Sequence, residues 1–435
     1  MTDPTIALLL NNPFANDSRS WKIARSLTAR GWRVTVVARR GEGLPNREER
    51  DGVMVVRLDQ PRPLAWLPSP RLPEAATGDP TTSGASAMAT LRRLATAAIG
   101  RPIQGVRYLL LARQWADRIG ASVPSADIWQ AEGLITLPVA LALRGARGGR
   151  VVYDARDLQV ESSRLARLPG AWRRLLASRE RSWARAADAT ITANEPYAEV
   201  IRQSIGLEPT IVFNGPLAAA TDPAAGADEI GRSAPAAAIR SSLGLAPSTR
   251  IVLCLGNVAP GRGVEQLCRA IGEVSDAILL IVGPGGAFRD RLAAEAATLP
   301  AADRIRFLPG VKPADIPAWT AAADVAAMII QPTTLNHRLT TPTRLFDAFG
   351  AGVPIVASDL PGMAAIIRAT GGGVVCDPGD PAAIAAAIRS ILDASPDVRL
   401  AYRAAALAAA RGAYAWETQA DKLAGVYRIL GIESR

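Results

Sequence analysis

Short apolar runs alternate with longer amphipathic stretches along much of this chain. In the first half, an apolar run at 5–10 is followed by an amphipathic stretch that ends at Gly31, and then by "RVTVVAR". This order predicts a strand, a helix with a glycine cap and a second strand. The alternation recurs at "DIWQAEGL", "GRVVYDARDL", "DATITANEP" and "PTIVFNGP". Continuous apolar strands separated by helices indicate a parallel sheet covered on both faces, so we expect a doubly wound α/β domain.

The second half of the chain repeats this pattern. Its apolar runs include "RIVLCL", "AILLIVGPGG", "DVAAMII" and "VPIVAS", with amphipathic stretches between them. They predict a second doubly wound domain. The stretch at 217–235 between the two series is rich in Ala, Gly, Asp and Pro and predicts a linker. After Asp380 the chain is predicted to be helical, and its last helix carries Trp416, Leu423 and Tyr427 on an apolar side.

An insertion at about 60–125 interrupts the first series. It begins with a loop rich in Pro, Gly, Ser and Thr and continues as a basic, partly amphipathic helical region. Two interpretations of that region are open. It lies on a membrane surface, or its helices pack over the sheet with their arginines in solvent.

Composition is that of an ordinary globular protein, with 49% hydrophobic and 21% charged residues. At 435 residues the chain is long enough for two domains. The net charge of +10 is compatible with an anionic partner. The rarity of lysine beside abundant arginine equally fits a GC-rich coding bias. Since no nucleic-acid-binding module accompanies the charge, we expect no nucleic-acid partner.

Cysteine and histidine are too scattered to suggest a metal site. Cys254, Cys268 and Cys376 have no CxxC spacing, and His337 is the single histidine. We therefore expect no structural zinc and a reducing compartment. The N-terminal apolar run is too short for a signal peptide, and no uncharged stretch is long enough to cross a membrane. These features predict a cytoplasmic protein.

The segment "TPTRLFDAFGAGVPIVASDLPG" has the features of an anion-binding helix start. Thr341 is the predicted N-cap and Pro342 the predicted first helical residue, which would leave backbone N–H groups free for a phosphate. Arg344 would add a fixed cation, and Asp347, one turn further on, could accept two ribose hydroxyls. The alternative is an ordinary surface pair between Arg344 and Asp347.

A second anion-binding loop is predicted at "LGNVAPGRGVEQL", where Arg262 lies between glycines at the start of a helix. The pattern alone is common in α/β proteins. The chain has neither a GxGxxG followed by an acidic residue nor a GxxxxGK[ST] loop. Their absence argues against a nicotinamide-dependent dehydrogenase and against a P-loop ATPase.

Several segments together resemble the family 4 glycosyltransferases, which have the GT-B fold. The segment that begins at Thr341 is similar to the donor-site segment of that family, and "APGRGVEQL" to the loop that opens its second domain. "NPFANDSRSWKIARSLTARGWRVTVVAR", "VVYDARDL" and "VFNGP" resemble segments of its first domain. The last helix, "YAWETQADKLAGVYRIL", resembles the helix that returns to the first domain. The resemblance covers the chain outside the insertion.

The resemblance implies the GT-B fold, with two Rossmann-like domains that face each other across a cleft. The first domain would comprise residues 1–216, completed by 418–435, and would receive the acceptor. A linker would follow at 217–248, and a second domain at 249–417 would bind the nucleotide sugar.

The site residues follow from the same resemblance. Arg262 and Arg344 would stabilise the leaving diphosphate and are the predicted catalytic residues, with Asp157 and Glu132 as further candidates that position the sugar or acceptor. The implied donor site consists of Gly256, Asn257, Gly261, Arg262, Gly263, Thr343, Arg344, Leu345 and Asp347. Asn16, Asp17 and Arg19 are candidates for contacts with the acceptor or the diphosphate. The alternative for Asp17 is a helix N-cap, and for Arg19 a surface cation.

Four positions depart from the family pattern. Leu339 stands where many members have Glu, and Asn257 where Arg or Lys is frequent. Glu132 and Arg156 stand where histidines often occur. These departures bear on contacts with sugar hydroxyls and on any assistance by histidine.

The predicted function is a retaining transfer of a sugar from a nucleotide-diphosphate sugar, without a metal or other cofactor. The predicted acceptor is a glycan or a lipid-linked precursor, with a peripheral contact at the inner membrane face. Two other hypotheses remain open. The chain is a catalytically silent GT-B subunit that regulates or scaffolds a partner glycosyltransferase, or it is a nucleotide-sugar epimerase. The poverty in histidine argues against the epimerase.

Overall fold

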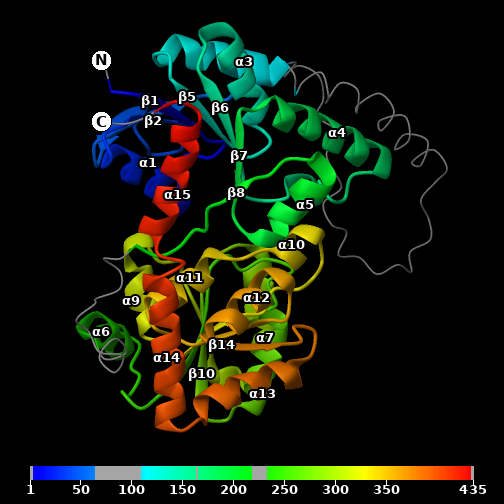
Figure 1. Ribbon diagram of the computed structural model, residues 1–435. Coiled ribbons are helices and arrows are strands. Elements are labelled where there is room, and N and C mark those ends of the chain that lie inside the picture. The colour runs from blue at the N-terminus through cyan, green and yellow to red at the C-terminus, as the bar shows by residue number, and fades with distance from the viewer. Residues whose placement is uncertain (1–2, 64–107, 109, 163–164, 218–232, 433–435) are drawn as a thin grey trace, which may run out of the picture.

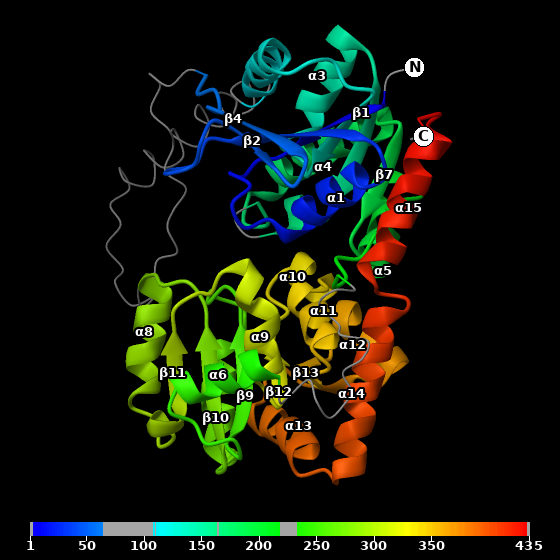
Figure 2. The same ribbon diagram turned by 90° about the vertical axis from the view of Figure 1, so that its left-hand side faces the viewer.

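The computed structural model describes residues 3–63, 108, 110–162, 165–217 and 233–432. These residues form two α/β domains, one above the other in Figure 1 and in the rotated view of Figure 2. Each domain has its own sheet with helices on both faces. The structure therefore confirms the prediction of two doubly wound domains.

The sheet of the first domain has eight strands in the order β3-β4-β2-β1-β5-β6-β7-β8. All neighbours are parallel except β3 and β4. The strands are β1 (Thr5–Leu9), β2 (Arg33–Arg39), β3 (Arg47–Arg50), β4 (Val53–Leu58), β5 (Ile128–Glu132), β6 (Arg150–Ala155), β7 (Ala189–Thr192) and β8 (Thr210–Ile211).

Helices cover both faces of this sheet. They are α1 (Ser18–Thr28), α3 (Leu137–Arg147), α4 (Gly170–Ala186) and α5 (Glu195–Ile205), with the 3₁₀ turn η1 (Gln159–Glu161) before α4. Residues 110–122 are also helical, and Trp115 and Ile119 on them are buried against the sheet. For this described part of the predicted insertion, the interpretation of a helix packed over the sheet holds. The remainder, at 64–107 and 109, lies outside the described residues.

The hairpin formed by β3 and β4 is absent from the sequence-based prediction. Its signal is the pair Asp51 and Gly52, both of which have positive φ (54° and 74°). An Asp-Gly pair between two strands is typical of a type I′ turn. The strand before this turn, "REER", has no apolar pattern that would indicate a strand, because β3 is an edge strand with no buried residue.

The second sheet has six parallel strands in the order β11-β10-β9-β12-β13-β14. The strands are β9 (Arg250–Leu255), β10 (Ala277–Val282), β11 (Ile305–Leu308), β12 (Val325–Met328), β13 (Ile355–Ser358) and β14 (Gly373–Cys376). The helices are α6 (Ala234–Ser242), α7 (Val264–Ala270), α8 (Ala287–Ala296), α9 (Ile316–Ala321), α10 (Leu335–Leu339), α11 (Thr343–Gly350), α12 (Pro361–Thr370), α13 (Pro381–Leu392), α14 (Pro396–Arg411) and α15 (Trp416–Ile429). Short 3₁₀ turns are η4 (Ile271–Glu273), η5 (Ala302–Arg304) and η6 (Pro313–Asp315).

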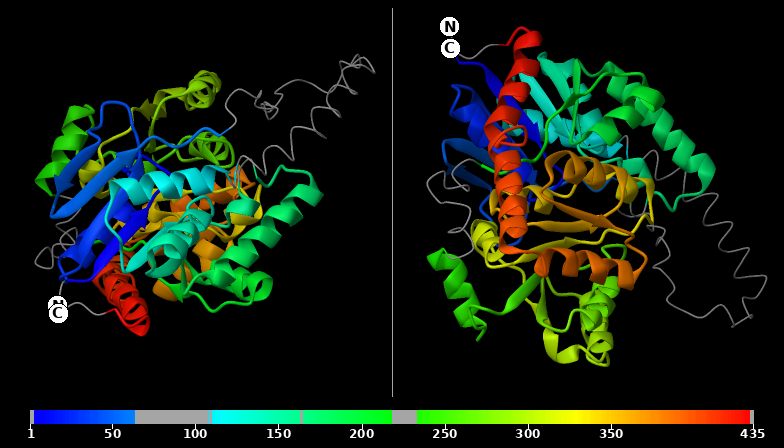
Figure 3. Two further views of the ribbon diagram at one scale, coloured as in Figure 1. Left: turned by 90° about the horizontal axis from the view of Figure 1, so that it is seen from above. Right: turned by 60° about the horizontal axis from the view of Figure 1, so that its bottom comes forward.

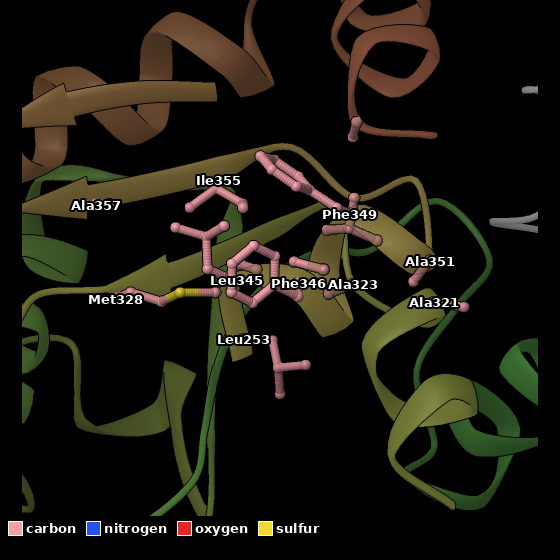
Figure 4. Close-up of a cluster of buried hydrophobic side chains, with 14 of the residues drawn as sticks. Leu253, Ala321, Ala323, Met328, Leu345, Phe346, Phe349, Ala351, Ile355 and Ala357 are labelled. Atoms are coloured by element: carbon pink, nitrogen blue, oxygen red, sulfur yellow. The ribbon is translucent and has the colours of Figure 1, made fainter. Parts of the chain in front are cut away.

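Helix α11 is anchored by its apolar face. Leu345, Phe346 and Phe349 are fully buried, and Figure 4 shows them packed with Met328 and Ile355 of the neighbouring strands. This packing fixes the axis of α11, so its first residues keep a defined position at the end of the sheet. The predicted burial of these three side chains is confirmed.

Part of the stretch predicted as a linker belongs to the second domain instead. Helix α6 lies within 217–248, and its Ala236 is fully buried in the core of that domain. Arg240 on the same helix forms an ion pair with Asp324 at 2.8 Å. The alanine-rich composition that suggested a linker is also compatible with a short helix.

Helix α15 returns from the second domain to the first, as Figures 1 and 2 show. Trp416, Leu423 and Tyr427 are buried in the same cluster as the first strands of the chain. The ring of Tyr427 packs edge-on against Trp32 with centroids 6.1 Å apart. The predicted apolar side of this helix is thereby confirmed. Within the described residues, no helix is long and apolar enough to span a bilayer.

Candidate functional site

The order of the strands locates the ligand-binding end of each domain. The order in which strands are added to the sheet reverses between β1 and β5 in the first sheet and between β9 and β12 in the second, although both strand pairs are parallel. Open α/β sheets bind their ligands beyond the carboxyl ends of the strands at such a point. The loops that follow these four strands and β6 therefore define the candidate site.

The glycine-rich loop after β9 fits closely against the loop after β12. Gly261 has a φ of +80°, and a side chain there would press on Thr333 and His337. Gly263 caps α7 with a φ of +69°, and a Cβ atom there would overlap the carbonyl oxygen of Ile329. The Gly261 carbonyl also accepts a hydrogen bond from the backbone N–H of Gln331 at 2.9 Å. Glycine is thus required by the packing of two loops.

Arg262 lies between these glycines. It is partly exposed, and its guanidinium makes no hydrogen bond or ion pair within the described part of the chain. Its positive charge lowers the pKa of Asp157 and of His337, although burial dominates both shifts. Arg262 is therefore a cation available for a bound anion. Gly256 precedes the loop at φ +139°, and Asn257 beside it is exposed.

The start of α11 differs from the prediction in its cap. The N-cap residue is Pro342, and the hydroxyl of Thr341 does not cap the helix. Thr341 Oγ1 instead donates to the carbonyl of Gly362 at 2.6 Å and accepts from Asn194 Nδ2 at 3.0 Å. The proline sets the extended backbone that leads into the helix. The backbone N–H groups of Thr343 and Arg344 still open its first turn.

Arg344 and Asp347 form an ion pair with each other on the first turns of α11. Both side chains are about a quarter exposed, at 30% and 24%. Burial raises the pKa of Asp347, while Arg344 and Lys22 lower it. The pair between Arg344 and Asp347, which is the alternative interpretation of the sequence, is thus formed. It lies at the edge of the second domain that faces the first. The side chain of Leu345 is in the core, so its predicted place in the donor site would depend on its backbone.

Lys22 connects the first domain to this region. It lies on α1, is 7% exposed, and donates to the carbonyl oxygens of Asn214 at 3.2 Å and Gly215 at 2.5 Å. Its ammonium also lies 4.8 Å from the ring centre of Trp416. Burial lowers the pKa of Lys22 to about 7, and the charge of Asp347 opposes that shift. Asn214 Nδ2 in turn donates to Thr343 Oγ1 at 2.8 Å.

A compact charge network occupies the corresponding end of the first domain. Glu132 is the last residue of β5 and Arg156 follows β6, and they form an ion pair at 2.9 Å. Arg156 also bonds to Asp17 at 3.0 Å, and Ser20 Oγ donates to Glu132 at 2.6 Å. Burial raises the pKa of Glu132 to about 8, which Arg156 counteracts. Glu132 Oε1 is buried without a hydrogen-bond partner among the described residues.

The candidates of the loop after β1 are placed differently from one another. Asp17 is the N-cap of α1 and accepts from the Ser20 N–H at 3.1 Å, so the N-cap alternative is correct. Arg19 is neither a surface cation nor available to a diphosphate. It is buried, bonds to both carboxylate oxygens of Asp154 and donates to the carbonyl of Val212. Asn16 is exposed, and its side chain makes no hydrogen bond or ion pair with the described part of the chain.

Direct hydrogen bonds join the two domains beside the site. Asn336 on α10 accepts from the Leu158 N–H at 2.9 Å and approaches Asp157 at 3.4 Å. Tyr197 OH donates to the Asn336 carbonyl at 3.2 Å, and Asn194 Nδ2 donates to the Leu339 carbonyl at 2.9 Å. Asp157 therefore lies at the domain boundary, where burial raises its pKa.

The sequence-based prediction missed the residues that hold the domains together. They are polar side chains in otherwise apolar surroundings: Lys22, Asn194, Asn214 and Asn336. Lys22 offered a signal, because it is one of three lysines in an arginine-rich chain and falls among the apolar positions of α1. The asparagines offered none, since Asn at the end of a strand is typical of a helix cap or turn.

No group of three or more His, Cys, Asp or Glu side chains within the described residues is arranged to hold a metal ion. Asp17, Glu132 and Asp347 near the site are paired with arginines instead. The absence of a metal from the reaction remains a prediction.

Comparison with known families places both domains. A profile described as "Glycosyl transferase 4-like domain" matches residues 18–215, and one described as "Glycosyl transferases group 1" matches residues 249–394. Together they cover most of the chain, and each corresponds to one of the two sheets.

Solved structures share the whole fold. Sucrose-phosphate synthase from Thermosynechococcus elongatus superposes with a TM-score of 0.72 at 18% identity, over 99% of this chain and 100% of that one. Anabaena HepE in complex with UDP and glucose superposes with a TM-score of 0.67 at 16% identity, over 97% and 99%. At this identity the likeness shows the fold alone, which is that of a GT-B protein.

The chain belongs to the family 4 glycosyltransferases. Among curated relatives, D-inositol 3-phosphate glycosyltransferase of Segniliparus rotundus is 31% identical over 199 residues, which are 44% of this chain and 42% of that protein. A GDP-mannose-dependent alpha-(1-6)-phosphatidylinositol monomannoside mannosyltransferase of Mycolicibacterium smegmatis is 31% identical over 179 residues, or 40% and 46%. The chain thus spans less than half the length of these relatives. The predictions of the fold and of the family are confirmed.

Proposed function

We propose that this protein transfers a sugar from a nucleotide-diphosphate sugar to a hydroxyl group of an acceptor, with retention of configuration. The observation that carries the proposal is that Arg262 follows β9 and the start of α11 with Arg344 follows β12, which are the two strands of the switch point, with Arg344 beside Gly256 of the loop after β9. A helix N-terminus and two arginines there suit a diphosphate. Asp347, one turn further along α11, suits the hydroxyls of the ribose.

In the proposed reaction, the bond from the anomeric carbon to the diphosphate breaks as a bond from the acceptor oxygen forms. The proton of the acceptor hydroxyl passes to the departing phosphate oxygen on the same face of the sugar. Negative charge develops on the diphosphate, and Arg262 and Arg344 stabilise it from fixed positions. This scheme needs no nucleophile from the protein. Arg344 would divide its hydrogen bonds between Asp347 and the phosphate.

The acceptor is assigned to the switch point of the first sheet, where Asp157 meets the second domain. Glu132, behind the Arg156 side chain, would position the acceptor through this network. The names of the relatives include inositol phosphate and phosphatidylinositol mannoside acceptors, so a phosphate-bearing or lipid-linked polyol is the acceptor class to test. A lipid-linked acceptor would bring the protein to the inner membrane face.

Calorimetric titration with UDP, GDP and their common sugar conjugates tests the donor part of the proposal. We expect saturable binding of one nucleotide and, with a matching acceptor, release of that nucleoside diphosphate and a new glycoside of retained configuration. Binding without turnover across the acceptor classes, and turnover only after a partner chain is added, would favour the silent subunit. Absence of binding to every nucleotide would refute the donor site.

A further inference from the structure

Helix α4 presents an unusually exposed surface on the first domain. Only Ala184 of its 17 residues is buried. The helix runs along the outer side of the domain, away from α15, as Figure 1 and both views of Figure 3 show. It packs against α3 and α5, and its Trp183 packs against Tyr108. Most of its surface is therefore not covered by the described residues.

The charge of this surface is one-sided. The segment from Arg167 to Arg185 contains a single acidic residue, Glu180, and six arginines: Arg167, Arg173, Arg174, Arg179, Arg181 and Arg185. Glu180 does not neutralise the exposed face, because its carboxylate accepts a hydrogen bond from the buried Tyr153 hydroxyl at 2.7 Å. The helix thus carries a strong positive field toward solvent.

Of the five arginines on α4 itself, three make no side-chain hydrogen bond or ion pair within the described part of the chain. Arg173 lies 3.7 Å from Glu161, and Arg185 donates to the Ile205 carbonyl at 2.8 Å. Arg174, Arg179 and Arg181 are exposed and make no side-chain hydrogen bond or ion pair with the described part of the chain. Arginines that stabilise a fold usually bind a carboxylate or a carbonyl, so these three are available to an external anion.

The spacing of the arginines along α4 puts them on its accessible side. Arg174, Arg181 and Arg185 lie seven and four residues apart and form one stripe along the helix. Arg179 lies on the other flank, and Leu175 between the flanks is 48% exposed. An exposed leucine with arginines on both sides is typical of a helix that lies in a lipid headgroup layer. A purely acidic protein partner would leave the leucine unexplained.

We propose that α4 is the surface through which the protein binds membranes rich in anionic lipid, with Arg174, Arg179 and Arg181 on the headgroups and Leu175 at the acyl boundary. In the sequence, α4 is the first helix after η1, which itself follows Asp157 by two residues. Contact there would place the boundary between the domains close to a lipid-linked acceptor. The inference rests on the proposed lipid-linked acceptor, but membrane binding can be measured without any turnover.

Vesicle co-sedimentation of the full chain tests this proposal. We expect binding to vesicles of phosphatidylglycerol and phosphatidylcholine at low salt, and loss of binding as salt shortens the Debye length. Vesicles of phosphatidylcholine alone should not bind. In a triple variant with Arg174→Glu, Arg179→Glu and Arg181→Glu, binding should weaken at least tenfold, since one arginine near an anionic surface changes affinity about fivefold. Leu175→Ser should weaken it further at physiological salt.

A matched control separates this surface from the net charge of the protein. Arg33, Arg269 and Arg428 are exposed on β2, α7 and α15, and their replacement by Glu changes the net charge equally. We expect that control to bind vesicles like the wild type. Equal weakening in both triple variants, or none in the α4 variant, would overturn the proposal. If the protein binds no vesicle but is retained on polyglutamate, and if the α4 changes abolish that retention, the helix would be assigned to an acidic protein partner instead. Donor titration of the same variants should be unchanged, so a failed donor site is recognised separately.

Discussion

Glu132 at the end of β5 and Arg156 directly after β6 form an ion pair with each other at 2.9 Å. The family resemblance implied histidine at both positions, so the two departures from the family pattern are in contact although they lie far apart in the sequence. Loss of Arg156 would leave the buried Glu132 without its ion-pair partner, whereas Arg156 would keep Asp17 if Glu132 were changed. An arginine, whose charge is fixed, thus stands at a position where a histidine would titrate near neutrality.

Replacing Glu132 by Gln should change how stability depends on pH. Burial raises the pKa of Glu132 to about 8 in the folded state, from an ordinary value of 4.5 that approximates the unfolded state. A raised pKa means that its contribution to stability is present at acidic pH and is lost as pH rises toward 8. Glu132→Gln should therefore gain stability relative to the wild type between pH 5 and pH 8, by at most about 1.4 kcal/mol per pH unit.

Denaturant unfolding of both proteins at pH 5, 6.5 and 8 measures this difference. Glu48→Gln on the edge strand β3 provides a control with another arginine-paired glutamate. A constant difference between Glu132→Gln and the wild type over the whole range would contradict the raised pKa.

Lys22→Met should show the opposite trend. The pKa of Lys22 is lowered to about 7 by burial, from an ordinary value of 10.5. A lowered pKa means that the contribution to stability is present at alkaline pH and is lost as pH falls toward 7. The wild type should therefore gain stability relative to Lys22→Met between pH 7 and pH 9.5. Thermal unfolding monitored by circular dichroism at several pH values measures this; a gain toward acidic pH would rule out the assigned shift.

Asp347→Ala should weaken binding of the nucleotide sugar. The lost hydrogen bonds to a charged group correspond to about 1.5 to 3 kcal/mol, or about a 10- to 100-fold higher Kd. Removal of Asp347 also frees Arg344 from its partner, so binding of inorganic diphosphate should be weakened less than binding of the nucleotide sugar. Calorimetry with both ligands measures this difference.

Asp359→Ala is the matched control for Asp347→Ala. Asp359 also pairs with an arginine, Arg368, at 2.7 Å, but on the exposed side of the second domain. We expect its donor affinity to equal that of the wild type. Unchanged affinity in both variants would remove Asp347 from the site.

Gly263→Ala should damage the loop after β9. The residue has a left-handed backbone, and an added Cβ would overlap the carbonyl of Ile329. We expect a loss of stability of about 2 kcal/mol or more, because neither backbone can yield without moving a strand end. Gly145→Ala on α3 has open space around the new methyl group and should be neutral or slightly stabilising. Differential scanning calorimetry of both variants tests the contrast, and equal melting temperatures would refute it.

The fold was predictable because it depends on features that are local in the sequence. The period of apolar residues marked most of the strands, and the apolar side of α15 marked its return to the first domain. The hairpin of β3 and β4 was missed because an exposed edge strand carries no apolar period. Helix α6 was missed because alanine-rich segments are typical of both linkers and short helices.

The candidate site was less predictable because its contacts join residues far apart in sequence. The resemblance singled out Arg344 and Asp347, but their mutual bond competes with a ligand and depends on rotamers. The local sequence of Arg19 is compatible with a surface cation, because its partner, Asp154 near the end of β6, lies far away in the sequence. Thr341 had the features of a helix cap, and only the approach of Gly362 and Asn194 explains its actual bonds.

The two passages of the chain between the domains are bonded to each other. The Trp416 N–H donates to the Pro216 carbonyl at 2.8 Å, and Gly215 lies so close to Tyr414 that a side chain would overlap its carbonyl oxygen. Lys22 contacts both passages. The two connections between the domains therefore lie together, with Lys22 beside them. A rotation of one domain against the other about this place would move the arginines of the donor side along an arc and leave Lys22 nearly in place.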